Sequence, residues 1–240
     1  MIRVENLTRN FGNIKAVKGI SFELQKGEIL GFIGPNGAGK STTMRMITGY
    51  LTPSSGKVYI DGLDMANNEA AAKKLIGYLP ESAPMYGEMT VEGFLNFSAE
   101  IRKMSRKEKK QAVQKVIELC FLENVRYQVI NTLSKGYKQR TCFAQAIIHN
   151  PPLVILDEPT DGLDPNQKRK MRQVIQDFGK DKAVIFSTHI LEEVELICSR
   201  VILIDQGIKK IDESKEEFMQ KSASLHETFY QLTNGGGQNA

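Results

Sequence analysis

The segment from Gly34 to Ser41 constrains the fold of this chain more than any other. It reads Gly-Pro-Asn-Gly-Ala-Gly-Lys-Ser and matches G-x-x-x-x-G-K-[ST], a glycine-rich loop that holds phosphate groups. An apolar run, Ile29 to Ile33, precedes it, and Met44, Ile47 and Leu51 follow it at helical spacing. Because the motif needs a strand before it and a helix after it, we interpret the segment as a phosphate-binding loop rather than an ordinary glycine-rich turn.

The residue types in this loop fit a nucleoside triphosphate with Mg²⁺. Glycines let backbone N–H groups turn towards one point, and the following helix directs its positive end at the same point. Lys40 would contribute a full charge to the β- and γ-phosphates, and the Ser41 hydroxyl would ligate Mg²⁺. The residues expected to bind nucleotide here are Gly34, Pro35, Asn36, Gly37, Ala38, Gly39, Lys40, Ser41 and Thr42.

Composition is that of an ordinary globular chain. Of its 240 residues, 25% are charged and 41% hydrophobic, and no apolar run approaches the ~20 residues of a membrane span. The start of the chain alternates like a strand and does not resemble a signal peptide, so we expect a cytoplasmic protein. Cys120, Cys142 and Cys198 are far apart and are expected to be buried, reduced thiols. The net charge of +4 does not indicate a nucleic-acid partner.

The order of patterns along the chain predicts an α/β fold. Residues 1–30 alternate like strands, whereas residues 81–150 have helical spacing and contain a capping box at Ser105 to Glu108. After residue 150, apolar strands such as Leu153 to Leu156 alternate with amphipathic helices. This alternation predicts a mostly parallel sheet covered on both faces, with residues 81–150 inserted as a helical subdomain.

Two strand ends carry the candidate catalytic residues. Asp157 and Glu158 follow an apolar strand, and ligands bind at the carboxyl ends of strands in α/β sheets. We therefore expect Asp157 to face Mg²⁺, directly or through water, and Glu158 to act as general base on a water that attacks the γ-phosphate. His189 ends the next predicted strand and is expected beside Glu158, on the γ-phosphate or the attacking water.

Ser134 indicates a second anion site. It is a suitable N-cap for a helix that runs to about His149, and Gly136 lies close by. That helix has ~15 residues and a length of about 22 Å at the α-helical rise, which places Ser134 far from the chain's own phosphate loop. A phosphate at Ser134 would belong to another chain, so the sequence predicts a dimer with nucleotide between its subunits.

These motifs, in this order, resemble those of the nucleotide-binding domains of ABC transporters over essentially the whole chain. They are the phosphate loop, Leu133 to Tyr137, Asp157 to Thr160, Gly162 to Asp164, and His189. The resemblance implies a P-loop NTPase (RecA-like) core with an N-terminal antiparallel β subdomain and an inserted helical subdomain. It also implies head-to-tail dimers, homo- or heterodimeric, that close over two ATP molecules with Mg²⁺.

The resemblance assigns further boundaries and residues. A single domain would span 1–240, with the β and RecA-like core at 1–80 and 151–212, the helical subdomain at 81–150, and short C-terminal helices with a flexible tail at 213–240. Phe11 would stack on adenine, Val17 would flank the base, and Asp164 would lie in a loop that crosses the dimer interface.

The chain departs from the common family pattern at three positions. Lys135 and Tyr137 replace the Gly and Gln of L-S-G-G-Q, and Glu81 replaces a usual glutamine. These variants resemble the subfamily that exports drugs, lipids, polysaccharides or ions and that includes gliding-motility components. A carboxylate at Glu81 would still reach Mg²⁺ or its water, whereas Tyr137 does not replace the hydrogen bonds of an amide.

The leading hypothesis is the ATP-hydrolysing subunit of an exporter at the cytoplasmic face of the membrane. Its permease would be a separate chain that docks at about residues 82–98, with Met85, Tyr86, Met89 and Phe94 as candidate contacts. The alternative is a soluble ABC-family ATPase that acts on ribosomes or nucleic acid, but such proteins usually have two ATPase domains or a long coiled coil. A regulator that does not hydrolyse ATP would not need Lys40, Asp157, Glu158 and His189 together.

Overall fold

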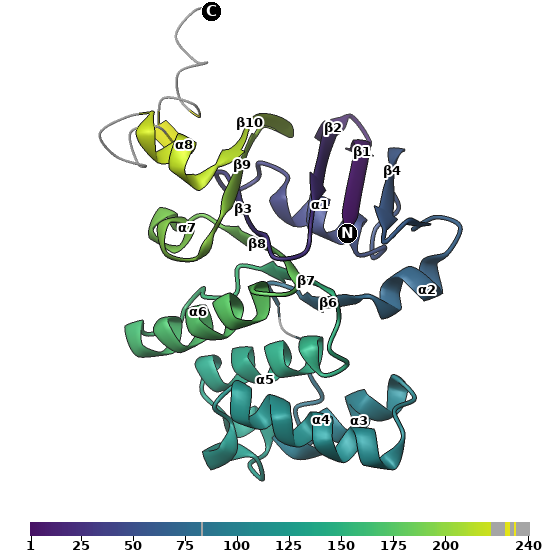
Figure 1. Ribbon diagram of the computed structural model, residues 1–240, viewed down its shortest axis with the longest axis vertical. Coiled ribbons are helices and arrows are strands. Elements are labelled where there is room, and N and C mark those ends of the chain that lie inside the picture. The colour runs from purple at the N-terminus through teal and green to yellow at the C-terminus, as the bar shows by residue number, and fades with distance from the viewer. Residues whose placement is uncertain (83, 222–228, 231–232, 234–240) are drawn as a thin grey trace, which may run out of the picture.

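The computed structural model describes residues 1–82 and 84–221, together with 229, 230 and 233, and they form two sheets flanked by helices (Figure 1). One sheet is antiparallel and has the order β2-β1-β4-β5. Its strands are β1 (Ile2–Phe11), β2 (Ile14–Leu24), β4 (Ser55–Ile60) and β5 (Leu63–Asp64).

The second sheet has the order β10-β9-β3-β8-β7-β6 and is parallel except at β10. Its strands are β3 (Ile29–Ile33), β6 (Ile76–Leu79), β7 (Leu153–Asp157), β8 (Ala183–Thr188), β9 (Arg200–Asp205) and β10 (Ile208–Ser214). Together the two sheets confirm the expected P-loop α/β fold with its N-terminal antiparallel part.

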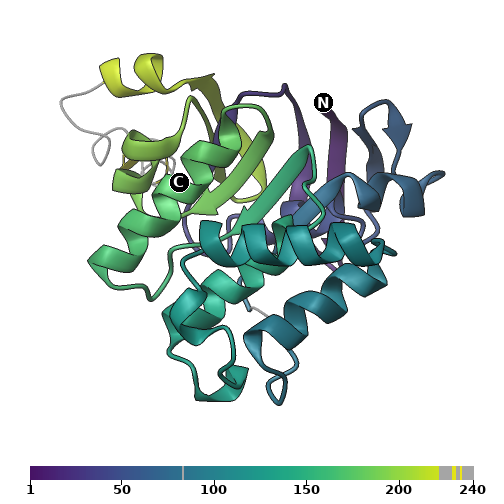
Figure 2. The same cartoon turned by 60° about the horizontal axis from the view of Figure 1, so that its bottom comes forward.

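The helices are α1 (Lys40–Ile47), α2 (Glu69–Lys74), α3 (Val91–Ile101), α4 (Arg106–Leu119), α5 (Lys135–Ile147), α6 (Pro165–Gly179), α7 (Leu191–Ile197) and α8 (Lys215–Gln220), with 3₁₀ turns at Glu123–Val125 and Ile130–Thr132. Helices α3, α4 and α5 pack together beyond the edge of the parallel sheet, at the bottom of Figure 1, and come forward in Figure 2. Whether residues 81–150 act as one subdomain stays a prediction.

Alternation along the parallel strands builds two cores, one on each face of the sheet. In β7, Leu153 and Ile155 face the core shared with the antiparallel sheet, whereas Val154 and Leu156 face the core shared with helices α3 to α7. Successive side chains of a strand point to opposite faces, so a continuously apolar strand must be covered on both sides. The strand is accordingly buried throughout.

The capping box predicted at Ser105 to Glu108 is confirmed at the start of α4. Ser214 and Glu217 form a second capping box, and Asp164 accepts hydrogen bonds from two backbone N–H groups at the start of α6. Such caps satisfy donors that have no partner within the helix. Part of the C-terminal segment, including the predicted tail, lies outside the described residues.

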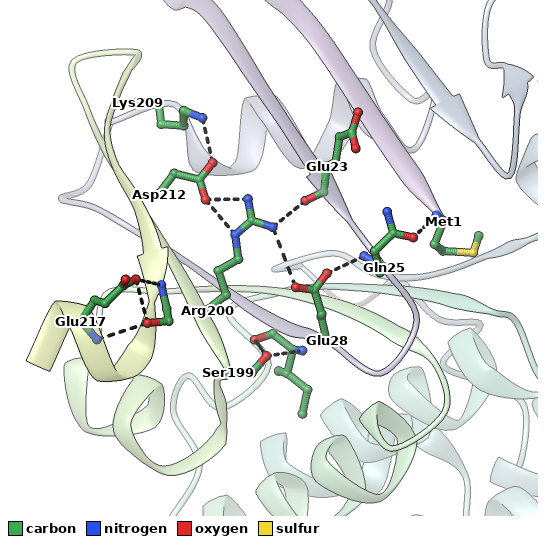
Figure 3. Close-up of polar contacts among 11 residues, drawn as sticks. Met1, Glu23, Gln25, Glu28, Ser199, Arg200, Lys209, Asp212 and Glu217 are labelled. Atoms are coloured by element: carbon green, nitrogen blue, oxygen red, sulfur yellow. Dashed lines mark hydrogen bonds and ion pairs between the residues drawn. The ribbon is translucent and has the colours of Figure 1, made fainter.

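A polar network centred on Arg200 joins the two sheets (Figure 3). The Arg200 guanidinium donates to the carbonyl of Glu23 at the end of β2 and pairs with Asp212 on β10 at 2.7 Å. Lys209 donates to the same Asp212 carboxylate at 2.8 Å. Because the planar guanidinium offers several donors at fixed angles, one side chain links β2, β9 and β10.

Gly19 lies within β2 at φ +94°, and Ile101 is exposed at the end of α3. All three cysteines are free and buried, as expected. Within the part of the chain that the structure describes, no helix combines the length and apolar character needed to cross a bilayer.

Candidate nucleotide site

The phosphate loop joins the carboxyl end of β3 to the start of α1. Gly37 and Gly39 have φ +79° and +104°, which glycine adopts without steric cost. A Cβ at Gly34 would overlap the carbonyl oxygen of Ile204, and a Cβ at Gly39 would come within 2.6 Å of that of Ala16. Gly34 and Gly39 are therefore required by close backbone approach, whereas Gly37 is favoured by its conformation alone.

Lys40 lies against the carbonyls of its own loop. Its Nζ donates to Gly34 O at 2.7 Å and to Pro35 O at 3.2 Å. Burial lowers the pKa of Lys40, and the carboxylates of Glu158, Asp157 and Glu81 oppose that shift. A desolvated ammonium held in this way attracts a polyphosphate strongly, since charges interact more in a partly buried site than in water.

Asp157 and Ser41 form the candidate Mg²⁺ site. Asp157 Oδ1 accepts from Ser41 Oγ at 3.1 Å and from Ser187 Oγ at 2.6 Å, whereas the buried Asp157 Oδ2 has no hydrogen-bond partner. Among the residues the structure describes, no three His, Cys, Asp or Glu side chains could hold a metal together. The pair fits Mg²⁺, which in nucleotide sites uses one or two protein ligands plus water and phosphate oxygens.

Glu158 and His189 lie side by side at the ends of β7 and β8. Glu158 Oε2 is 3.0 Å from His189 Nδ1, and the backbone N–H of Glu158 donates to Ser187 Oγ at 3.1 Å. Burial raises the pKa of Glu158, and the contact with His189 opposes the rise. Glu158 also has φ +52°, an uncommon conformation for a residue with a side chain, and such strain concentrates at functional positions.

A pocket of about 290 Å³ lies between these groups. Its wall contains two carboxylates that lie far apart in the sequence, Glu81 and Glu158. The lining residues are Ala16, Asn36, Gly37, Gly39, Lys40, Ser41, Thr42, Glu81 and Glu158. Three of the predicted loop residues do not line the pocket: Gly34, Pro35 and Ala38.

The two predicted adenine contacts lie in different environments. Phe11 is exposed at the end of β1, and the Arg9 guanidinium lies over its ring, 4.6 Å from the ring centroid. Val17, by contrast, has no exposed surface and belongs to the core. The structure thus corrects the expectation for Val17, because a fully buried side chain cannot flank a base, and Ala16 takes its place in the pocket wall.

The predicted second anion site lies outside this pocket. Ser134 caps α5 by accepting from the N–H of Tyr137 at 3.5 Å, and Gly136 is buried on the first turn of that helix. Asp164 caps α6 and does not line the pocket either. Tyr137 packs against the core with Arg140 over its ring, so it presents no amide-like group at the helix start.

The sequence interpretation missed Ser187 as a site residue. β7 and β8 pair in parallel with Asp157 opposite Ser187, so the Ser187 hydroxyl holds both the Asp157 carboxylate and the Glu158 N–H. The available signal was a polar residue at the end of an apolar strand. That signal becomes informative only when the neighbouring strand is known.

Comparison with known proteins identifies the family. The family model described as ABC transporter matches residues 17–161, which contain the phosphate loop, Ser134 and the Asp157-Glu158 pair. The chain belongs to the ABC transporter family. It is therefore an ATP-binding subunit with the ABC ATPase fold.

Individual relatives agree with this ABC ATPase assignment. The linearmycin resistance ATP-binding protein LnrL of Bacillus subtilis is 37% identical over 208 residues, covering 86% of this chain and 67% of LnrL. An ATP-binding subunit of an ABC transporter has a TM-score of 0.88 at 29% identity, covering 97% and 99% of the two chains. The cassette MJ0796, solved as a dimer in a post-hydrolysis state with ADP and phosphate, has a TM-score of 0.80 at 26% identity, covering 89% and 98%.

The close approach at Gly34 of this ABC ATPase gives a stability prediction. Gly34→Ala should lower the free energy of unfolding by about 3 kcal/mol or more, because the new Cβ overlaps the Ile204 carbonyl and backbone must move. Gly37→Ala is the matched control, since a Cβ there meets nothing within 4 Å and only its φ is strained, at about 1–2 kcal/mol. Urea unfolding of both variants measures the difference, and equal losses would contradict the steric explanation.

Proposed function

We propose that this ABC ATPase hydrolyses ATP to drive export through a separate permease. The observation that carries the proposal is the gathering of Lys40, Ser41, Asp157, Glu158 and His189 at one edge of the parallel sheet. These groups account for triphosphate binding, a metal site and a base. The name of its relative LnrL, a resistance protein, supports outward transport.

In the proposed reaction the residues of the site divide phosphate binding, metal binding and proton transfer among them. Lys40 turns from the loop carbonyls to the β- and γ-phosphates. Ser41 and Asp157 would hold Mg²⁺, which supplies charge neutralisation on the phosphate oxygens, and Glu81 would hold one of its waters. Glu158 accepts a proton from the attacking water, while His189 orients Glu158 and contacts the γ-phosphate.

The proposal needs a second chain because Ser134 and Gly136 do not line the pocket of their own chain. In a head-to-tail dimer, the start of α5 would bind the partner's γ-phosphate, and Asp164 would lie in the loop at the interface. The Ser134 hydroxyl and the positive end of α5 suit an anion. The dimer of MJ0796 supports this arrangement.

Ser134→Ala should weaken ATP-driven dimerisation far more than ATP binding to the monomer. Loss of one charge-assisted hydrogen bond costs about 1.5–3 kcal/mol, and a symmetric dimer contains two such sites. Size-exclusion chromatography with and without ATP measures the fraction of dimer. Both forms of the protein also carry Glu158→Gln, because that substitution slows turnover. Ser105→Ala is the control, because it removes the same kind of helix cap from α4. Equal effects on monomer binding and dimerisation would contradict the assignment of Ser134 to the partner's nucleotide.

A groove of about 830 Å³ supports permease docking at residues 82–98. It is lined by Tyr86, which is exposed and stacks edge-on against Phe97 at 5.3 Å, and by the basic residues Arg45, Lys73, Lys74 and Arg102. Its described lining residues include no Asp or Glu. Phe94 is buried in the core below, and Met85 and Met89 are partly buried against it. The groove fits an amphipathic segment that carries carboxylates.

The permease proposal is tested by recovery of the tagged protein from detergent-solubilised membranes of its own cell. An integral membrane transporter subunit should be recovered with the wild-type chain and lost with Tyr86→Asp or Arg102→Glu. The exposed Lys180→Glu, remote from the groove, should retain it. Recovery of ribosomes or nucleic acid instead would favour the soluble alternative.

We further propose that the protein is peripheral at the cytoplasmic face and that residues 1–240 form one ATPase domain with the subdomain boundaries given above.

A further inference from the structure

The start of α5 is tied to the loop that follows Glu158. Lys135, the first residue of α5, forms an ion pair with Asp161 at 3.0 Å. The Lys135 side chain also lies over Gly162, where a Cβ would overlap its ammonium group. On the neighbouring turn, the Gln167 side chain of α6 lies over Gly136 in the same way. Two of these contacts join the start of α5 to the loop before α6, and the third joins it to the first turn of α6.

The loop from Glu158 to Asp164 is a series of tight turns. The N–H of Asp161 donates to Glu158 O at 3.2 Å, and that of Leu163 donates to Thr160 O at 3.3 Å. Asp164 then accepts from the N–H groups of Asn166 and Gln167 at 3.0 Å. These hydrogen bonds connect Asp161 directly to Glu158 and connect the end of the loop to α6. A displacement of Asp161 would therefore move Glu158 on one side and the start of α6 on the other.

Lys135 lies in an unusual place for a cation. The N-terminal end of a helix carries partial positive charge, which disfavours lysine there unless an anion lies close by. Asp161 is that anion in the structure. A triphosphate bound at the start of α5 would be a second, more highly charged one.

We propose that Lys135 is a positioning residue that couples the two nucleotide sites of the dimer. A partner nucleotide at Ser134 and Gly136 draws the Lys135 ammonium from Asp161, and the loop then repositions Glu158 at the chain's own nucleotide. The proposal rests on the dimer described under Proposed function. It assigns a role to the lysine that replaces the usual glycine at this position.

Charge reversal tests the coupling. Lys135→Glu and Asp161→Lys, each alone, should lower the kcat for ATP hydrolysis and reduce its cooperativity. We expect kcat to fall at least about fivefold, which is the lower end of the usual coupling between sites. ATP affinity of the monomer should not change, because neither residue lines the pocket. The double variant restores an ion pair but places a carboxylate at the start of α5, which the partner's triphosphate repels, so its kcat and cooperativity should stay low.

Controls separate this coupling from general effects. Lys180→Glu breaks the comparably exposed Lys180–Asp177 pair at the far end of α6 and should leave kcat unchanged. Thermal unfolding checks that each variant folds. If single reversals leave kcat unchanged, or the double variant regains the normal kcat and cooperativity, the coupling is overturned while dimerisation stands. If the Glu158→Gln protein with otherwise native sequence does not dimerise with ATP, the proposed dimer fails and the coupling with it.

Discussion

Glu158→Gln should lower the steady-state rate of ATP hydrolysis by about 10²–10⁴-fold, the usual contribution of a general base, while ATP still binds. Glutamine has nearly the same shape and retains an oxygen for the contact that Glu158 Oε2 makes with His189. It cannot, however, take a proton from water. Because binding continues and turnover stops, ATP should also hold the variant as a dimer, which sizing detects.

The direction of the pH dependence supports the same test. Burial raises the pKa of Glu158, so the carboxyl takes up a proton at a higher pH than an exposed glutamate does. A protonated carboxyl is no base, and the wild-type kcat should fall on acidification before the ordinary glutamate range is reached. The residual rate of Glu158→Gln should lack this fall.

The control for Glu158 is Glu195→Gln, the same chemical change at an exposed position on α7. Its rate and pH profile should match those of the unaltered protein. If Glu158→Gln retained a tenth of the normal rate, Glu158 would not be the base. An ATP affinity lost together with the rate would assign Glu158 to binding instead.

The fold was predictable because its signals are local and repeated. Each parallel strand is a short apolar run, and its alternate side chains enter two different cores, as Leu153 and Val154 do. The strand before Gly34 and the helix after it follow from the same periodicity. By contrast, α2 and β10 were not predicted, because α2 buries only Ala72 and β10 buries only Ile211. Such elements depend on tertiary contacts for their stability.

The site was predictable as far as its motifs extend and no further. Sequence order indicates which strands end in Asp157 and His189, but not that Ser187 lies opposite Asp157. The family resemblance implies that Phe11 stacks on adenine, but it does not show that the Arg9 guanidinium lies over the Phe11 ring. The prediction that Val17 flanks the base was wrong for a similar reason, since only the packed structure shows which side of β2 faces the core. The sequence alone does not show which strands pair, or which side chains meet, when they are far apart along the chain.

The structure also explains why one chain offers only part of the proposed machinery. Lys40, Asp157 and Glu158 are anchored on the ends of rigid central strands and on α1, whereas Ser134 is anchored on α5 in the helical layer. Side chains on rigid elements are held accurately but cannot travel to each other. In the proposed dimer, a second chain would supply the missing group without moving either element, which favours closure of a dimer over closure within one subunit.

Lys40→Met should weaken ATP binding by about 10- to 100-fold, because a hydrogen bond to a charged group contributes about 1.5–3 kcal/mol and 1.4 kcal/mol corresponds to a factor of ten. Methionine keeps the length and apolar stem of the side chain but has neither charge nor donor. The ligand-free protein should retain its fold. Loss of the donors to the carbonyls of Gly34 and Pro35 is offset by removal of a desolvated charge.

Ligand-induced stabilisation makes the effect of Lys40→Met measurable. At an ATP concentration of one hundred times the wild-type Kd, binding stabilises the wild-type fold by about 2.7 kcal/mol. A hundredfold weaker Kd leaves only about 0.4 kcal/mol at the same concentration, so ATP should hardly raise the Tm of the variant. Lys57→Met, which removes an exposed lysine on β4, should retain the full shift. A full shift in Lys40→Met would mean that the backbone N–H groups and the α1 helix end hold the triphosphate without the lysine.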